Sequence, residues 1–404
     1  MSATIAYLRN HKYNGIDDIE QIKNDFYKVY IKVSYDNKII NGKRKVIFTS
    51  TKGMRSQKFD KIIYECNGLV LEAPSWKPLN VPCPTPKISV KNEVVNKFLN
   101  QNKYQIYKIS DGTLIYLYYW NGLWYISTAR GLDMEKVKLN GHEYHKLLDD
   151  VLSKYSISFN DFTDLLDKNY SYSFVIRHPD IHPFTQENDD SFIFVHRIGY
   201  NNSTIQINRS NHNLPLDIPY QEKITDEVKL HDLYSILSSS LHNWINTKTN
   251  TLFGYLLIST ESYKVSGDHS CILLESSLMR QIRQFVYDKK FMEFGEDREL
   301  AIIVNGFLSP QKNIFIELFP QYQSYFTQLE IIQQNLIENI LNNSTNEQKE
   351  TIPIVTADPV SYLTSVVQKK ITLDTNDIEL SKKHIYGIIN HTSYIRLYLQ
   401  MLSN

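Results

Sequence analysis

The chain has 404 residues, 42% hydrophobic and 22% charged, which is enough for one large or two smaller globular domains. Lysine plus arginine and aspartate plus glutamate each total 44, which excludes a uniform positive field, so a polyanion would need a local basic patch. The three cysteines have no Cys-x-x-Cys spacing, and no apolar run reaches the ~18 residues of a membrane helix, so we expect a cytoplasmic protein without a membrane partner.

The N-terminal part of the chain mixes helical and extended patterns. We expect a helix over 17–27, strands over 29–35, 45–50 and 62–72, and an extended proline-rich connector over 78–86. A short helix is expected over 92–100, followed by a strand–turn–strand unit over 104–128. Asn121-Gly122 lies between two β-rich runs in that unit, which is a strong hairpin signal.

The remaining chain is α+β at first and then helical. Helices are expected over 141–154, 159–167 and 226–246, and strands over 172–177, 192–197, 204–207, 252–259 and 262–266. The later helices are expected over 273–290, 297–308, 311–343, 357–370 and 379–402, with a polar linker from Asn342. We therefore predict an α+β fold with an N-terminal α+β extension (1–60), a central domain (61–290) and a helical C-terminal domain (291–404).

The most informative segment lies at the start of the hairpin unit. It reads Tyr107-Lys-Ile-Ser-Asp-Gly-Thr113 and runs directly into the apolar strand pattern. ATP-dependent RNA ligases and capping enzymes carry a Lys-x-Asp-Gly signature on a strand of this kind. Asp111 and Gly112 match the signature, but Ile109 stands where the lysine nucleophile belongs.

Further segments resemble the same family, in the same order along the chain. They are Tyr64 to Leu71, Trp76 to Pro84, Lys108 to Leu114, Ser127 to Gly131, Tyr172 to Pro179, Phe253-Gly254 and Tyr263 to Ser266. Together they resemble the adenylyltransferase domain of RNA ligases of the bacteriophage T4 ligase 1 type, over about residues 60–290. The abundance of Asn, Ile, Lys and Tyr is typical of AT-rich genomes, among them those of large DNA viruses.

The resemblance carries expectations about fold, ligands and site. It implies a nucleotidyltransferase fold with antiparallel sheets, RNA as a partner, and ATP or GTP with Mg²⁺ as cofactors if the cleft is functional. Arg130, Lys264 and Gly112 would then contact the nucleotide or its phosphates. The alternatives are a turn-exposed arginine, a solvated strand lysine and a tight bend that needs glycine.

The chain departs from the family at several functional positions. Asn67 replaces an arginine, Phe253 replaces a glutamate, and Ser266 (or Ser262) replaces one of two phosphate-binding lysines. A motif glutamate is also replaced around Val175–Arg177. Because phosphoryl transfer depends on a nucleophile and on charges around the phosphates, their joint loss predicts a catalytically inactive protein.

A basic run near the N-terminus is a candidate RNA contact. It comprises Lys43, Arg44, Lys45, Lys52, Arg55 and Lys58, and a solvated charged face is its alternative interpretation. No metal site is expected, because His142 and His145 are three residues apart instead of the four of zinc proteases and have no third ligand nearby.

Three functional hypotheses follow. The first is an inactive ligase-like protein that binds RNA, such as an mRNA 5′ end, or acts as a scaffold in RNA processing or translation, with its helical C-terminal part docking a protein partner. The second is an active RNA ligase or guanylyltransferase whose nucleophile has moved to Lys108, with Asp111 retained. The third is a structural subunit without nucleic-acid contact.

Overall fold

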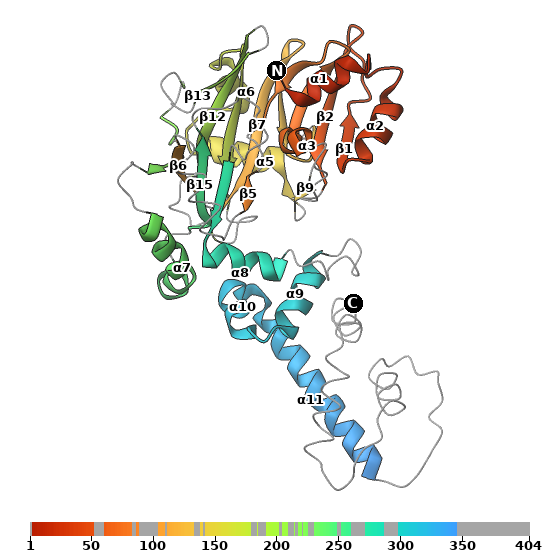
Figure 1. The fold of residues 1–404 in the computed structure, drawn as a ribbon. Helices are drawn as coiled ribbons and strands as arrows, with labels where there is room; N and C mark the ends of the chain where they lie inside the picture. The colour runs from red at the N-terminus through yellow and green to blue at the C-terminus, as the bar shows by residue number, and fades with distance from the viewer. Residues whose placement is uncertain are drawn as a thin grey trace. The chain divides into compact units, whose positions relative to one another are not determined.

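The computed structural model of the chain shows how these segments are arranged (Figure 1). Its contacts divide the chain into two units, Met1–Met279 and Arg280–Asn404. The expected boundaries after residues 60 and 290 stay predictions. The structure describes residues 2–51, 60–82, 86–88, 104–109, 111–132, 138–139, 142–178, 184, 191–201, 204–208, 214, 217–219, 221–224, 230–248, 252–259, 271–286 and 298–345.

An antiparallel sheet, called sheet A, opens the first unit. Its strands follow the order β1-β2-β3-β4. They are β1 (Ile31–Tyr35), β2 (Arg44–Ser50), β3 (Asn67–Ala73) and β4 (Lys77–Asn80). Because β3 and β4 lie after residue 60, the expected extension 1–60 shares its sheet with the chain that follows. The helices beside this sheet are α1 (Ala3–Asn10), α2 (Ile19–Tyr27) and α3 (Asp60–Glu65).

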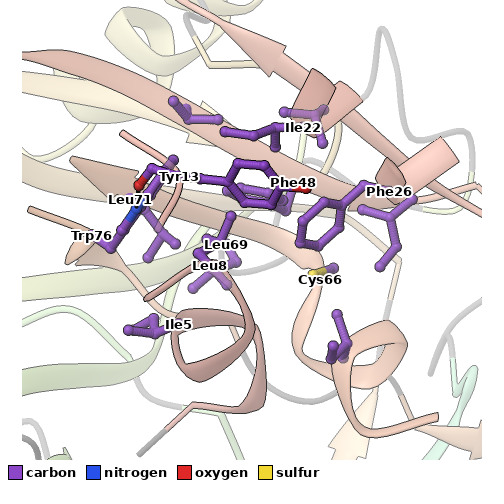
Figure 2. Close-up of a cluster of buried hydrophobic side chains, with 14 of the residues drawn as sticks. Ile5, Leu8, Tyr13, Ile22, Phe26, Phe48, Cys66, Leu69, Leu71 and Trp76 are labelled. Carbon is purple, nitrogen blue, oxygen red and sulfur yellow. Dashed lines mark hydrogen bonds between the residues drawn. The ribbon is translucent and has the colours of Figure 1, made fainter. Parts of the chain in front are cut away.

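The helices and sheet A enclose a hydrophobic core (Figure 2). On α2, Ile19, Ile22 and Phe26 are spaced three and four residues apart, so they share the face that is buried. Phe26 and Phe48 pack with ring centroids 5.0 Å apart. Trp76 is fully buried, and its indole N–H donates to the carbonyl of Tyr13 at 2.7 Å, so the core contains no unsatisfied indole.

A second antiparallel sheet, sheet D, has the order β13-β12-β11-β7-β8. Two of its members, β7 and β8, form the predicted hairpin, and Asn121 and Gly122 adopt φ values of 48° and 88°. The positive values suit the type I′ turn that Asn-Gly favours. The strands are β7 (Thr113–Trp120), β8 (Leu123–Thr128), β11 (Tyr170–Ile176), β12 (Phe192–Asn201) and β13 (Thr204–Asn208).

Two helices cover one face of sheet D. These are α5 (Tyr144–Ser153) and α6 (Phe159–Asp164), which follow the short paired strands β9 (Lys138–Leu139) and β10 (His142–Glu143). Leu148 of α5 and Phe162 of α6 join Ile115, Phe174 and Phe192 of the sheet in a single core. Alternate residues of β7 therefore face these helices, and the residues between them face the other way.

A third sheet, sheet C, has the order β14-β6-β15-β16-β5. Only the pair β16–β5 is parallel among its described strands. Leu233 and Leu237 of α7 (Leu230–Thr247) pack on the face that carries Ile106, Tyr255 and Leu257. The strands are β5 (Lys87–Ile88), β6 (Tyr104–Ile109), β14 (Lys223–Ile224), β15 (Gly254–Ser259) and β16 (Cys271–Glu275). The expected α+β class with antiparallel sheets is thus confirmed.

Sheets A and D pack against each other through the faces that their helices do not cover. Ile47 and Val70 of sheet A form a small core with Tyr118 and Trp120 of sheet D. The same layer contains Glu72, which is only 6% exposed. Its carboxylate accepts hydrogen bonds from the indole N–H of Trp120 at 2.8 Å and from the Ser75 hydroxyl at 2.9 Å. These bonds compensate the cost of burying the charge.

The second unit is helical over its described residues. Its core centres on Phe315, whose ring centroid lies 5.1 Å from that of Phe285 and 5.1 Å from that of Phe326. Gly306 lies against the Phe315 ring, so a side chain at residue 306 would collide with it. The elements are α8 (Ser277–Val286), which crosses the division between the units, α9 (Arg298–Leu308), α10 (Lys312–Leu318), the 3-10 turn Pro320–Tyr322 and α11 (Gln323–Thr345).

Several expected elements differ from the structure. The strand expected over 62–72 begins only at Asn67, because residues 60–65 form α3, and α1 was not expected at all. The helix expected from 273 is wrong at its start, where β16 pairs with β15. The helix expected over 311–343 is interrupted at Pro320, which cannot donate a helical hydrogen bond. The elements expected over 92–100, 262–266, 357–370 and 379–402 lie outside the described residues.

The environment of Glu72 predicts a pH dependence of stability. Burial by itself raises the pKa of Glu72, but hydrogen bonds from Trp120, Ser75 and Lys43 outweigh burial and the pKa is lowered. Such a carboxyl stabilises the fold above its unfolded-state pKa of about 4.3, and the stability is lost as the pH falls through the lower folded-state value. We expect the melting temperature of the wild type to fall more steeply below about pH 4.3 than that of Glu72→Gln. Parallel curves would contradict this assignment.

Candidate functional site

The strand that carries the signature separates Lys108 from Ile109. The pairing of β6 with β15 runs without a bulge from Tyr104 to Ile109, so successive side chains point to opposite faces. Lys108 therefore shares a face with Ile106, which packs against α7. Ile109 lies on the other face. A bulge that would bring Lys108 to the side of Ile109 is not present in this described pairing.

The amine of Lys108 is paired with a carboxylate from the segment that leads into β14. Its Nζ atom lies 3.3 Å from the carboxylate of Glu222, and the side chain of Lys108 is 32% exposed. The Lys108 backbone N–H also donates to the Glu222 carbonyl at 3.0 Å. Burial raises the pKa of the neighbouring Tyr255, and the negative charge of Glu222 adds to this effect. Lys108 thus lies between Glu222 on one side and Tyr255, the residue opposite it in β15, on the other.

Asp111 and Gly112 form the turn from sheet C into sheet D. The Asp111 carboxylate accepts from its neighbour's backbone N–H at 2.9 Å and from the Phe184 N–H at 3.3 Å. Gly112 has a φ of 144°, and a Cβ atom there would lie 2.4 Å from Val175 Cγ1. Only glycine fits this approach without strain, so the turn itself explains why the pair is present.

The position of the family's glutamate is occupied by an aromatic cluster. Phe253 precedes β15, and its backbone N–H donates to the Ile109 carbonyl at 2.8 Å. The ring of Phe184 lies 5.8 Å from that of Phe253 and 5.2 Å from that of Trp244, with edge-to-face geometry. Phe184 and Trp244 are buried. Apolar packing thus replaces an acidic group at this position.

The end of β11 approaches the same turn. Val175 and Ile176 contact the position where a Gly112 side chain would be, and so does Arg177 through its Cγ atom. Arg177 is 6% exposed, and its backbone N–H donates to the Ser191 carbonyl at 2.8 Å. The structure therefore brings together the segments around 109–112, 175–177 and 253–254, which are far apart in the sequence.

The segment expected to precede the nucleophile has a structural role. Glu65 ends α3, and its carboxylate accepts from the backbone N–H groups of Ala3 and Thr4 at 2.9 Å and 3.0 Å. It also accepts from the hydroxyl groups of Ser2 and Thr4 at 2.5 Å and 3.0 Å. These donors form the first turn of α1, so Glu65 caps that helix from a distance of sixty residues in the sequence.

Two of the ligase-like segments, Tyr64 to Leu71 and Ser127 to Gly131, contact each other beside β2. Gly68 has a φ of 96°, and a side chain there would lie 2.8 Å from the Cα atom of Ala129. The Thr49 hydroxyl donates to the Ala129 carbonyl at 2.9 Å. Thr128 tightens the same loop, since its hydroxyl accepts from the N–H groups of Arg130 and Gly131 at 3.2 Å and 3.1 Å. The Arg130 side chain is exposed at this loop.

The described part of the predicted basic run, residues 43–45, does not form one exposed surface. Lys45 is 1% exposed; its Nζ atom lies 3.4 Å from the Asp36 carboxylate and 3.2 Å from the centre of the Tyr125 ring. Arg44 is buried against the Tyr35 ring. Lys43 is half exposed and pairs with Glu72 at 3.2 Å. The pattern of charges in the sequence could not reveal this, because β2 is covered on both faces. Lys52, Arg55, Lys58 and Lys264 lie outside the described residues.

Two further features concern ligands and membranes. Among the described residues, no three His, Cys, Asp or Glu side chains are gathered as a metal site would require. In the same part of the chain, no helix has the length and apolar character needed to span a bilayer.

A hollow of about 400 Å³ lies between α5 and α6. It is lined by His145, Asp149, Phe159 and neighbouring residues, none of which belongs to the motifs.

Sequence relatives support the resemblance on which these motifs were assigned. A protein of African swine fever virus (isolate Tick/South Africa/Pretoriuskop Pr4/1996) named "Putative RNA-ligase" is 27% identical over 369 residues, covering 84% of this chain and 78% of the relative. Its counterpart in the Badajoz 1971 Vero-adapted strain is 26% identical over the same lengths. No family model matches the chain.

Comparison with solved structures found ligases at low TM-scores. An archaeal ATP-dependent RNA ligase has a TM-score of 0.41 and 11% identity, covering 78% of this chain and 79% of that chain. A protein of Aquifex aeolicus named "Putative ATP-dependent DNA ligase" has a TM-score of 0.40 and 11% identity, covering 79% of this chain and 81% of that chain. The viral relatives confirm the expected similarity to RNA ligases and to proteins of a large DNA virus.

The contacts of Glu65 predict a structural effect of its removal. We expect Glu65→Ala to lower the free energy of unfolding by about 1–3 kcal/mol, because the donors at the start of α1 lose their acceptor. Glu65→Gln retains one acceptor oxygen and should lie between the wild type and the alanine variant. Urea unfolding measures the difference. The matched control is Glu20→Ala, whose carboxylate is 66% exposed and makes only exposed contacts with Lys23 and Tyr35, so its removal should lower the stability only slightly. A Glu65→Ala variant no less stable than this control would contradict the assigned role.

Proposed function

We propose that this RNA-ligase-like protein binds RNA, with the 5′ end as the preferred element, and forms no covalent bond to a nucleotide. The observation that carries the proposal is the regular strand β6, which has Ile109 at the nucleophile position and Lys108 on the opposite face. A covalent ligase needs an amine that attacks the α-phosphate of the nucleotide. Ile109 has no such atom, and Lys108 is paired with Glu222.

The surroundings of Ile109 support the same conclusion. The aromatic ring of Phe253 stands where the family has a carboxylate, and it packs with Phe184. Asp111 accepts hydrogen bonds from the backbone of its own turn and of Phe184. Transition states of phosphoryl transfer are stabilised mainly by fixed charges, and these two positions supply folding contacts instead.

RNA as the ligand is supported by the names of the relatives and by the position of Arg130. The loop that carries Arg130 is fixed by Thr128 and by Thr49, so the backbone from which the exposed Arg130 side chain projects is held in a defined place. Arginine is well suited to phosphate because its planar group donates two parallel hydrogen bonds. A role as a scaffold that docks a protein through its helical second unit belongs to the same proposal.

A labelling experiment tests the absence of covalent catalysis. The protein is incubated with α-labelled ATP or GTP and Mg²⁺ and then run on a denaturing gel. We expect no label above background for the wild type, for Lys108→Ala or for Ile109→Lys, because restoring the amine does not restore the carboxylate at residue 253. A label on the wild type that disappears in Lys108→Ala would instead establish the alternative, an active ligase or guanylyltransferase that uses Lys108.

A binding experiment tests the RNA ligand and its end. Fluorescence anisotropy is measured with a single-stranded 12-nucleotide RNA that carries a 5′-triphosphate, a cap or a 5′-hydroxyl group. We expect binding that weakens with salt, and tighter binding of the phosphorylated or capped forms. Equal affinity for the three would refute the end preference, and no binding of any form would refute the RNA ligand.

A further inference from the structure

The outer edge of sheet A carries two exposed tyrosines. Tyr27 at the end of α2 is 77% exposed, and Tyr30, which precedes β1, is 41% exposed. β1 is the edge strand of its sheet, so this side is not covered by another strand of sheet A. Large aromatic side chains generally bury most of their surface, so two exposed rings three residues apart are unusual.

The backbone at Tyr30 is held in a strained conformation. Tyr30 has a φ of 62°, a left-handed value that glycine adopts readily and a bulky residue does not. Its N–H donates to the Tyr27 carbonyl at 3.0 Å. Its carbonyl accepts from both the N–H and the hydroxyl of Thr51, each at 2.9 Å. These bonds fix the backbone of Tyr30 at the entrance to β1.

Exposed cations continue from these tyrosines along the sheet. Lys32 is exposed on β1 and lies opposite Thr49 of β2. Thr49 in turn bonds to Ala129, the residue before the exposed Arg130. Tyr30 ends the turn that leads into β1, and Lys32 is the second residue of that strand. Lys28 is held by Asp25 at 2.8 Å and is not included.

We propose that Tyr27, Tyr30, Lys32 and Arg130 form a track for single-stranded RNA that runs from the turn before β1, across β1 and β2, to the loop that carries Arg130. The inference rests on the proposed RNA-binding function and assigns a surface to it. The tyrosine rings stack on bases, which duplex RNA does not expose. The two cations contact the phosphates of the same strand. The exposed cations Lys32 and Arg130 beside the exposed tyrosine rings favour a polyanion with aromatic bases as the occupant over a protein.

The two kinds of contact have different signatures in a salt titration. The probe is a 12-nucleotide oligouridine, and its affinity is measured by anisotropy at several salt concentrations. Lys32→Ala and Arg130→Ala should each reduce the slope of log K against log salt by about 0.7, the value for one phosphate on a single strand. Tyr27→Ala and Tyr30→Gly should each weaken binding about tenfold and leave the slope unchanged.

Controls separate this track from general effects. Tyr30→Gly should melt no lower than the wild type because glycine suits the φ of 62°, so lost affinity would not reflect unfolding. Lys154→Ala and Tyr325→Ala remove an exposed cation and an exposed ring elsewhere and should bind like the wild type. The tyrosine variants should also leave binding of a 12-base-pair duplex unchanged.

The outcomes distinguish the track from the function on which it rests. If the double variant Tyr27→Ala/Tyr30→Gly binds oligouridine like the wild type, the track is refuted while RNA binding stands. An equal loss for the single strand and the duplex would also refute it, because stacking on unpaired bases would not be involved. If the wild type binds no RNA, both the track and the proposed function fall.

Discussion

The regular pairing of β6 with β15 is the constraint on which the functional interpretation depends. Alternation along a strand assigns neighbouring residues to opposite faces, so an amine at residue 108 cannot replace one at residue 109 unless the backbone changes. The pairing on the other side reinforces this arrangement, because Lys108 exchanges backbone and side-chain contacts with Gln221 and Glu222. A shift of register would break these contacts together.

Around that strand, motif residues of a ligase take part in folding contacts. Glu65 caps α1, and Gly68 allows the loop before Arg130 to approach β3. Gly112 allows the turn into β7 to pass close to β11. Packing alone accounts for each of these residues, so their presence does not indicate that a nucleotide binds. The presence of a motif in this chain is therefore weaker evidence for chemistry than the identity of the side chain at the nucleophile position, Ile109.

The differences between the expected and observed elements have physical causes. Residues 60–65 have an apolar pattern short enough for a strand or a helix, and their contact with α1 favours the helix. The run at 271–275 reads as the start of a helix, but pairing with β15 makes it a strand. In the basic run, Lys45 is buried because Tyr125 and Asp36 surround its amine, and both belong to other parts of the chain.

The sequence alone determined the α+β class, the Asn121-Gly122 hairpin, the resemblance to RNA ligases and the loss of the nucleophile, because each depends on local pattern or on residue identity. Tertiary structure alone decided which face carries Lys108, that Phe253 packs with Phe184, and that Lys45 is enclosed between sheets A and D. These facts depend on strand register and on contacts between residues distant in the sequence. Hydrophobic periodicity contains no information about such contacts, since it records burial without naming the partner.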